Sequence, residues 1–306
     1  MKKNILLIIL TILVMAVTVI GCMFVYKFFT ETKEEAPLFT LETYPRVDAS
    51  LATQPLTDAF IKAFVGEHVD IDSIEYTNTH PAYIKLINGE TDLIVVTEPS
   101  EEERMLAKQA GVELVVTPVV KEGFVFYVNG NNPVSSLSIE QIQKIYTGEI
   151  TNWKQVGGND EPIRAFQRPA NSGSQTGMLS LVMKDLKLME PPKEDLVETM
   201  QAIINLVSDY DNGKNSIGYS YYYYATTMYS TIDETVANGI KLLKVNGVEP
   251  KYETIQNDTY PLNTAYYIVT RKDAENNEKI QTLKNAMLSK KGQNVAKEAG
   301  YVKIHE

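Results

Sequence analysis

The sequence predicts an α/β fold with a mostly parallel sheet, and three observations support this prediction. Apolar runs of strand length alternate with segments whose apolar residues recur at helical spacing. Small polar loops around Ser50, Thr79, Thr97 and Ser172 each follow a strand candidate. The length of 306 residues, with 44% hydrophobic composition, is enough for two domains with cores. Because ligands of such folds bind beyond the carboxyl ends of strands, we expect the polar loops to share one crevice.

Residues 1–29 are predicted to be a signal peptide or a membrane anchor. Lys2 and Lys3 precede an apolar run without charge that extends from residue 5 to residue 25. The only cysteine of the chain, Cys22, follows Gly21 near the end of this run. The stretch resembles a bacterial lipobox, in which cleavage before the cysteine leaves a lipid-modified N-terminus. Since the sequence stays apolar after Cys22, an uncleaved single-span anchor is the alternative.

Both alternatives place the rest of the chain on the extracytoplasmic face of the cell membrane. The positive charges of Lys2 and Lys3 stay on the inner side of the membrane, so the chain that follows lies outside. Residues 30–37, which include Glu31, Glu34 and Glu35, are expected to form a short polar linker.

After the linker, the apolar patterns predict alternating strands and helices. In the first part of the chain we expect strands at 39–44, 73–76, 93–96, 114–117 and 124–128, and helices after Ser50, at 82–88 and at 101–110. A second unit is expected to begin near Lys121. It has helices from Ser138, after Gly177 and at 195–208, and strands at 163–166, 216–219 and 240–245. A strand at 266–269 then carries the chain back to the first unit, and the last predicted helix spans 278–287.

The loop at 166–177 has the features of an anion-binding site. It follows a strand candidate and leads into a helix, whose first N–H groups and dipole attract negative charge. Arg168 provides a planar cation, Ser172 and Ser174 provide hydroxyl donors, and Gly173 lets the backbone approach a ligand closely. The simpler interpretation is a capping serine beside a surface arginine.

Composition excludes several other classes of function. The net charge of −10 argues against a nucleic-acid-binding surface. Three His and one Cys are too few for a Cys/His zinc cluster, and we expect neither a metal nor a cofactor. The serines around Ser172 lack the Gly-x-Ser-x-Gly pattern of a nucleophile elbow, so we do not expect an enzyme.

Several short motifs, in this order and spacing, resemble the phosphate-binding proteins of ABC importers. The motifs are Ser138-Ile139-Glu140-Gln141-Ile142, the turn at 146–153, Arg168 with Ser172-Gly173-Ser174, Ile217-Gly218-Tyr219, Tyr260-Pro261-Leu262, Gly292-Gln293 and Gly300-Tyr301. The resemblance implies a two-lobed type II periplasmic-binding-protein fold that closes over its ligand through two hinge crossings. It implies that residues 38–120 and 261–306 form lobe 1 and that residues 121–260 form lobe 2.

The resemblance also implies which residues hold the anion. In that family an arginine is followed four residues later by Ser-Gly-Thr, which matches Arg168, Ser172, Gly173 and Ser174. The family's first loop matches a Ser50 hydroxyl and the backbone N–H of Leu51. Its second loop corresponds to Thr79-His80-Pro81, where Pro81 has no N–H to donate.

One position of the family pattern departs from the expected residue. The family places an acidic residue after the strand that matches 93–96, whereas this chain has Thr97 followed by Glu98. A carboxylate there accepts a proton from hydrogen phosphate and rejects sulfate. Whether Thr97 or Glu98 faces the ligand is left open by the sequence.

The expected function is therefore extracytoplasmic capture of phosphate, or a similar small oxyanion, for the membrane subunits of an ABC importer. The protein is expected to be monomeric and tethered to the membrane through lipidated Cys22 or an N-terminal anchor, without nucleic-acid partners. The alternative is an anchored sensory or adhesion lobe of the same fold, with a different ligand or none.

Overall fold

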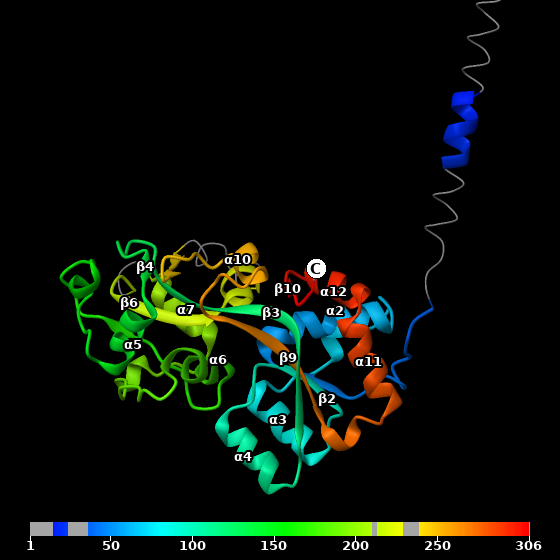
Figure 1. The fold of residues 1–306 in the computed structure, drawn as a ribbon, viewed down its shortest axis with the longest axis horizontal. Coiled ribbons are helices and arrows are strands. Elements are labelled where there is room, and N and C mark those ends of the chain that lie inside the picture. Colours follow the sequence, from blue (N-terminus) through cyan, green and yellow to red (C-terminus); the bar gives the residue numbers. More distant parts are fainter. Residues whose placement is uncertain (1–14, 24–35, 210–212, 229–238, 306) are drawn as a thin grey trace, which may run out of the picture. The chain divides into compact units, whose positions relative to one another are not determined.

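A computed structural model describes residues 15–23, 36–209, 213–228 and 239–305 of the chain (Figure 1). The chain divides into two compact units, residues 1–38 and residues 39–306. In the first unit, residues 15–23 are helical and Cys22 is exposed. No helix among the described residues combines the length and the apolar character needed to cross a membrane. The lysines Lys2 and Lys3, both ends of the predicted apolar run and most of the linker lie outside the described residues.

Residues 39–306 form an α/β unit whose sheet is mixed rather than mostly parallel. The strand order is β1 (Val47–Ala49), β2 (Leu93–Val96), β9 (Asn263–Arg271), β3 (Leu114–Asn129), β6 (Ser216–Tyr221) and β5 (Arg164–Ala165). β7 (Ile240–Leu242) and β10 (Val302–Lys303) also pair with β3. The pairs β1·β2 and β5·β6 are parallel, whereas every pair that involves β3 or β9 is antiparallel. The predicted α/β class is confirmed, but the predicted mostly parallel pairing is wrong.

The two long central strands explain this mixed pairing. The first part of β3, residues 114–123, pairs with β9, and the part from Phe124 onward pairs with β6 and β7. Figure 1 shows β3 and β9 running side by side between two groups of helices. In both parts β3 runs antiparallel to its partners, so this one long strand sets the antiparallel pairing through the middle of the sheet. The separate strands predicted at 114–117 and 124–128 are therefore one element.

The helices cover this sheet and begin at capping residues. They are α2 (Gln54–Phe64), α3 (Thr79–Asn88), α4 (Glu101–Gln109), α5 (Ile139–Thr147), α6 (Gly173–Gly177), α7 (Met200–Ser208), α10 (Tyr252–Gln256), α11 (Glu278–Leu288) and α12 (Lys290–Glu298). A π-helical segment, Met178–Met183, continues α6. A short parallel pair, β4 (Ser136–Leu137) with β8 (Lys244–Val245), lies outside the main sheet. Ser138 caps α5 as predicted, because its hydroxyl accepts a hydrogen bond from the N–H of Gln141.

Two predicted strands near the N-terminus are wrong. Residues 39–44 form a turn in which Phe39 packs against Tyr44 and hydrogen-bonds to the end of α2. The first strand is instead β1, which sequence reasoning missed because it contains Asp48. That carboxylate is buried, and it is compensated by Thr77 and Lys85. The predicted strand at 73–76 has no strand partner, because Ile71–Ser73 forms a 3-10 turn.

Three further boundaries differ from the prediction. The helix expected at 195–208 is α7, which begins only at Met200, because Thr199 caps it and Asp195 pairs with Arg164 at 2.6 Å. The strand expected at 240–245 is divided between β7 and β8. The helix α12 was not predicted, since it begins with Lys290-Lys291-Gly292 and has a narrow apolar face.

Glu122 is a fully buried carboxylate at the point where β3 passes from β9 to β6. It accepts hydrogen bonds from the N–H of Gly123 at 2.8 Å and of Tyr223 at 3.2 Å. Tyr221, Tyr223, Tyr266 and Tyr301 lie around it. Burial raises the pKa of Glu122 to about 8. The carboxyl group is therefore protonated in the folded protein over a pH range in which it is ionised in the unfolded chain.

Replacing Glu122 by Gln should make protein stability less dependent on pH. The pKa of Glu122 is higher in the folded protein than in the unfolded chain. The contribution of Glu122 to the free energy of unfolding is therefore complete below about pH 4.5 and is lost as the pH rises through 8. Between pH 5 and pH 8, wild type should therefore lose about 3 kcal/mol of unfolding free energy that Glu122→Gln does not lose, because glutamine does not titrate. Chemical denaturation at several pH values measures this difference, with Glu67→Gln as an exposed control. Parallel curves for wild type and Glu122→Gln would contradict the prediction.

Candidate functional site

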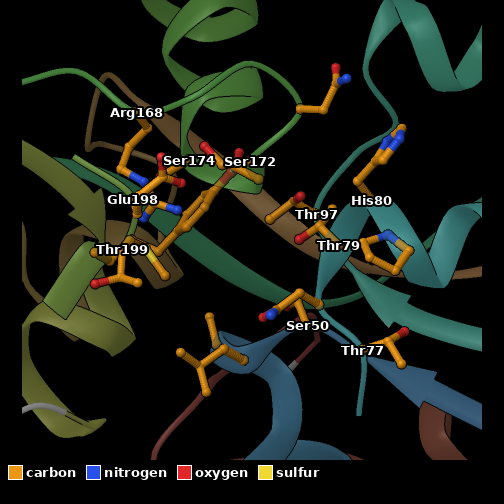
Figure 2. A pocket seen from close by; sticks show the side chains of 18 of the residues that line it. Ser50, Thr77, Thr79, His80, Thr97, Arg168, Ser172, Ser174, Glu198 and Thr199 are labelled. Atoms are coloured by element: carbon orange, nitrogen blue, oxygen red, sulfur yellow. The ribbon is translucent and has the colours of Figure 1, made fainter. Parts of the chain in front are cut away.

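A cavity of about 380 Å³ brings together eight of the nine predicted anion-binding residues. These are Ser50, Leu51, Thr79, Thr97, Arg168, Ser172, Gly173 and Ser174. Figure 2 shows Arg168, Ser172, Ser174, Glu198 and Thr199 on one side of the cavity and Ser50, Thr77 and Thr79 on the other. The polar loops, far apart in the sequence, therefore meet in one crevice as predicted.

The amino ends of several helical segments surround the cavity. Ser50 precedes the 3-10 turn Leu51–Thr53 that leads into α2, and Asn78 precedes α3. Ser172 is the N-cap of α6, and Thr199 is the N-cap of α7. The first N–H groups of a helix have no partner within the helix, and they carry the positive end of its dipole. The cavity is thus electropositive in its backbone although the chain carries a net charge of −10.

Arg168 is held at the cavity by buried polar side chains. Its backbone N–H donates to Gln175 Oε1 at 3.2 Å and lies 3.0 Å from the Tyr219 hydroxyl, which itself hydrogen-bonds to Gln175. Asn171, between Arg168 and Ser172, adopts a left-handed backbone with φ of 64°. This conformation turns the chain sharply into α6, and asparagine tolerates it better than most residues.

The guanidinium of Arg168 forms no ion pair with any described residue, and its Nε is buried without a hydrogen-bond partner. Burial lowers the pKa of Arg168 from its ordinary value. The cation nevertheless stays charged, since an arginine in a protein remains protonated. A buried and unpaired cation is costly, and an anion in the cavity would remove that cost.

Hydroxyl groups beside Arg168 are also without partners. The Oγ atoms of Ser172 and Ser174 are buried and have no hydrogen-bond partner among the described residues. Thr97 Oγ1 is buried near the Tyr221 hydroxyl without a hydrogen bond of normal geometry. Buried polar groups are usually satisfied. Their grouping around one cavity indicates that a polar ligand completes them.

The opposite side of the cavity combines capping and binding geometry. The Ser50 hydroxyl lies 2.9 Å from Thr53 Oγ1, in a capping arrangement at the start of the 3-10 turn. Ser50 therefore caps a turn and also lines the cavity. Thr79 and His80 lie in the first turn of α3 rather than in the loop that was predicted there. Pro81 follows them in the same turn, where its missing N–H breaks no helical bond.

Gly173 is placed where a side chain would force its neighbours to move. A Cβ atom at this position would lie 2.7 Å from Thr97 Oγ1 and 2.9 Å from Thr79 Oγ1. The backbone of α6 therefore approaches the end of β2 and the start of α3 closely. The carbonyl of Gly173 accepts a hydrogen bond from the Tyr221 hydroxyl at 2.9 Å. This bond also holds the start of α6 in place.

Glu98 is the one predicted site residue that does not line the cavity. Its carboxylate accepts a hydrogen bond from Ser180 instead. Thr97, by contrast, lines the cavity. A few residues further, Glu102 on α4 accepts a hydrogen bond from Asn171. Both carboxylates thus bind side chains beside α6.

His80 and Asp48 have mainly structural contacts. His80 Nδ1 lies 3.0 Å from the carboxylate of Glu103, which is buried and also caps α4. Asp48 does not line the cavity and holds the backbone N–H groups of Ala49 and Thr77. Asp48 therefore supports the segment before α3 without repelling an anion at close range.

Sequence reasoning missed several residues of the cavity. They are Ala52, Thr77, Asn78, His80, Pro81, Ala170, Asn171, Glu198, Thr199, Met200 and Tyr221, of which His80 and Pro81 had been considered without being chosen. Glu198 and Thr199 were assigned to a helix interior, although a threonine before an apolar helical pattern is a typical N-cap.

An α/β fold of this topology, with a polar cavity at helix amino ends, defines the class of solute-binding proteins. The chain belongs to the PBP superfamily, because the profile of the PBP superfamily domain matches residues 42–291. The fold is the type II periplasmic-binding-protein fold.

Individual relatives agree with this assignment. The phosphate-binding protein PstS of Bacillus subtilis is 25% identical over 261 residues, which cover 84% of this chain and 80% of the relative. PstS of Staphylococcus aureus is 26% identical over 268 residues, covering 85% and 78%. A Clostridium perfringens protein, described as a phosphate ABC transporter substrate-binding protein and solved with bound phosphate, is 27% identical with a TM-score of 0.62. That match covers 84% of this chain and 98% of the other.

Replacing Gly173 by Ala should weaken phosphate binding without unfolding the protein. The new methyl group would collide with the hydroxyls of Thr79 and Thr97 only where α6 meets them. Overpacking of this kind costs about 1–3 kcal/mol, which corresponds to roughly fivefold to 100-fold in affinity. Calorimetric titration with phosphate measures the loss, and thermal denaturation without ligand checks the fold. An unchanged affinity would contradict the close approach described above.

Proposed function

We propose that this protein is a membrane-tethered, extracytoplasmic solute-binding protein that captures phosphate or a similar small oxyanion for an ABC importer. The observation that carries the proposal is the half-buried guanidinium of Arg168, which forms no ion pair with a described residue. It lies at a cavity beside the hydroxyls of Ser172 and Ser174, which likewise have no described hydrogen-bond partner. These groups are donors or can act as donors, and they converge with helix amino ends. The named relatives bind phosphate, which favours phosphate among the oxyanions.

We further propose that Ser50, Thr79, Thr97, Arg168, Ser172 and Ser174 hold the anion through side chains. Leu51 and Gly173 would contribute backbone N–H groups. Burial of Thr97 and Ser174, each 3% exposed, supports a site from which water is displaced when the ligand enters. In such a site each charge-assisted hydrogen bond is stronger than in water.

Lobe closure over the ligand is part of this proposal. We assign residues 38–120 and 261–306 to lobe 1 and residues 121–260 to lobe 2. Two observations support these boundaries. The strand β3 pairs with β9 up to Gly123 and with β6 from Phe124 onward. At the same point, the N–H of Phe124 donates a hydrogen bond to the carbonyl of Leu262. Rotation at these two crossings would separate Gly173 from Thr79 and Thr97 and open the cavity.

The cavity is proposed to bind without chemical conversion. A hydrolase needs a general base within hydrogen-bond reach of its nucleophile. His80 is the histidine that lines the cavity, and its Nδ1 is paired with Glu103. Neither Ser172 nor Ser174 makes a hydrogen bond to it. Binding and release alone account for the donors that are present.

Replacing Arg168 by Ala should abolish most phosphate binding. Removing one partner of a buried charge pair costs about 2–5 kcal/mol, which corresponds to roughly 30-fold to several thousandfold in affinity. Isothermal titration calorimetry of protein purified without phosphate measures the affinity. Arg104→Ala, at an exposed position on α4, changes the net charge equally and should bind like wild type. Absence of any phosphate binding by wild type, or normal binding by Arg168→Ala, would contradict the proposal.

The mature N-terminus is proposed to be a lipid-modified Cys22. Mass spectrometry of protein extracted from membranes should therefore find a chain that begins at Cys22 with attached acyl groups. The variant Cys22→Ser should accumulate as the uncleaved precursor. An intact Met1 in the wild-type protein would instead favour a single-span anchor and, with it, the sensory or adhesion alternative.

A further inference from the structure

Glu198 is a carboxylate at the rim of a cavity that is otherwise suited to an anion. It lines the cavity together with Arg168, and its charge acts on the Arg168 guanidinium. Figure 2 shows both residues on the same side of the cavity. The other ionisable side chains among the lining residues are the phenol of Tyr221 and the imidazole of His80, which lies on the opposite side. For a bare oxyanion, Glu198 is a source of repulsion.

No contact within the described part of the chain explains Glu198. Its side chain makes no hydrogen bond or ion pair there, and it is exposed to the cavity mouth. The neighbouring acidic residue Asp195 is different, because it pairs with Arg164 and supports the turn before α7. Glu198 is therefore available to a ligand.

The cavity also has more room than a bare oxyanion needs. The five non-hydrogen atoms of phosphate, at roughly 30 Å³ each as for water in the liquid, fill at most roughly 150 Å³. The cavity holds about 380 Å³. Beyond the hydroxyls of Ser172 and Ser174 it is lined by Thr199, Met200 and the partly exposed side chain of Leu51. Met200 and Leu51 thus add apolar surface to the same cavity as Glu198.

We infer that the cavity accepts a phosphate monoester whose short substituent ends in an ammonium group. This inference rests on the proposed function, because the phosphoryl group occupies the same donors around Arg168. The alkyl part of the substituent lies against Leu51 and Met200, and the ammonium group pairs with the carboxylate of Glu198. Glu198 is then a specificity-determining residue that favours a zwitterionic ligand over a bare anion.

Calorimetric titration with three probes tests this inference. The probes are 2-aminoethyl phosphate, propyl phosphate as its isostere without the positive charge, and inorganic phosphate. Wild type should bind aminoethyl phosphate up to about fivefold more tightly than propyl phosphate, as expected for an exposed ion pair worth at most about 1 kcal/mol. In Glu198→Gln this preference should disappear, while inorganic phosphate should bind as tightly as in wild type or more tightly. Glu194→Gln, at an exposed position outside the cavity, should behave like wild type.

The outcomes separate this inference from the proposed function. If wild type binds phosphate but does not prefer aminoethyl phosphate, or if the preference survives in Glu198→Gln, the inference is overturned and the phosphate site stands. A loss of inorganic phosphate binding in Glu198→Gln would also overturn it, because Glu198 would then accept a proton from the phosphate itself. If no probe binds to wild type, the proposed function itself is contradicted.

Discussion

The unpaired positive charge of Arg168 is the constraint on which the rest of the site depends. An isolated charge in a partly buried position is unfavourable, so the surrounding structure has to hold it there. Gln175 and Tyr219 do so through the backbone, and neither neutralises the guanidinium. The fold thus holds this cation in place at an electrostatic cost, which the charge of Glu198 offsets only in part. A negatively charged ligand relieves this cost further, and this favours anions over neutral ligands.

Helix starts extend this constraint over the whole cavity. Ser50, Asn78, Ser172 and Thr199 each precede a helical segment, and they come from four distant parts of the sequence. Each start adds partial positive charge without adding a side chain that needs a counterion. This explains how an acidic protein presents an anion-binding surface. It also explains why Glu198, with its full negative charge, stands out among the lining residues.

Much of the site could be predicted from the sequence, because local patterns specify it. The strand, polar loop and helix around Arg168, Ser172 and Gly173 is a contiguous signal, and α5 was recognisable from its capping Ser138. What could not be predicted depends on contacts between distant segments. The strand β1 contains Asp48, whose burial is possible only because Thr77 and Lys85 reach it. The redirection of Glu98 away from the cavity depends on Ser180, more than 80 residues later.

The position of β9 has a consequence for how the protein is made. This strand, formed by residues near the carboxyl end, lies between β2 and β3, which come from the first half of the chain. Before β9 emerges, β2 and β3 expose unpaired edges to each other and to other chains. The sheet is completed only when synthesis or export is nearly finished, so assembly of the cavity is delayed until almost the entire polypeptide is present.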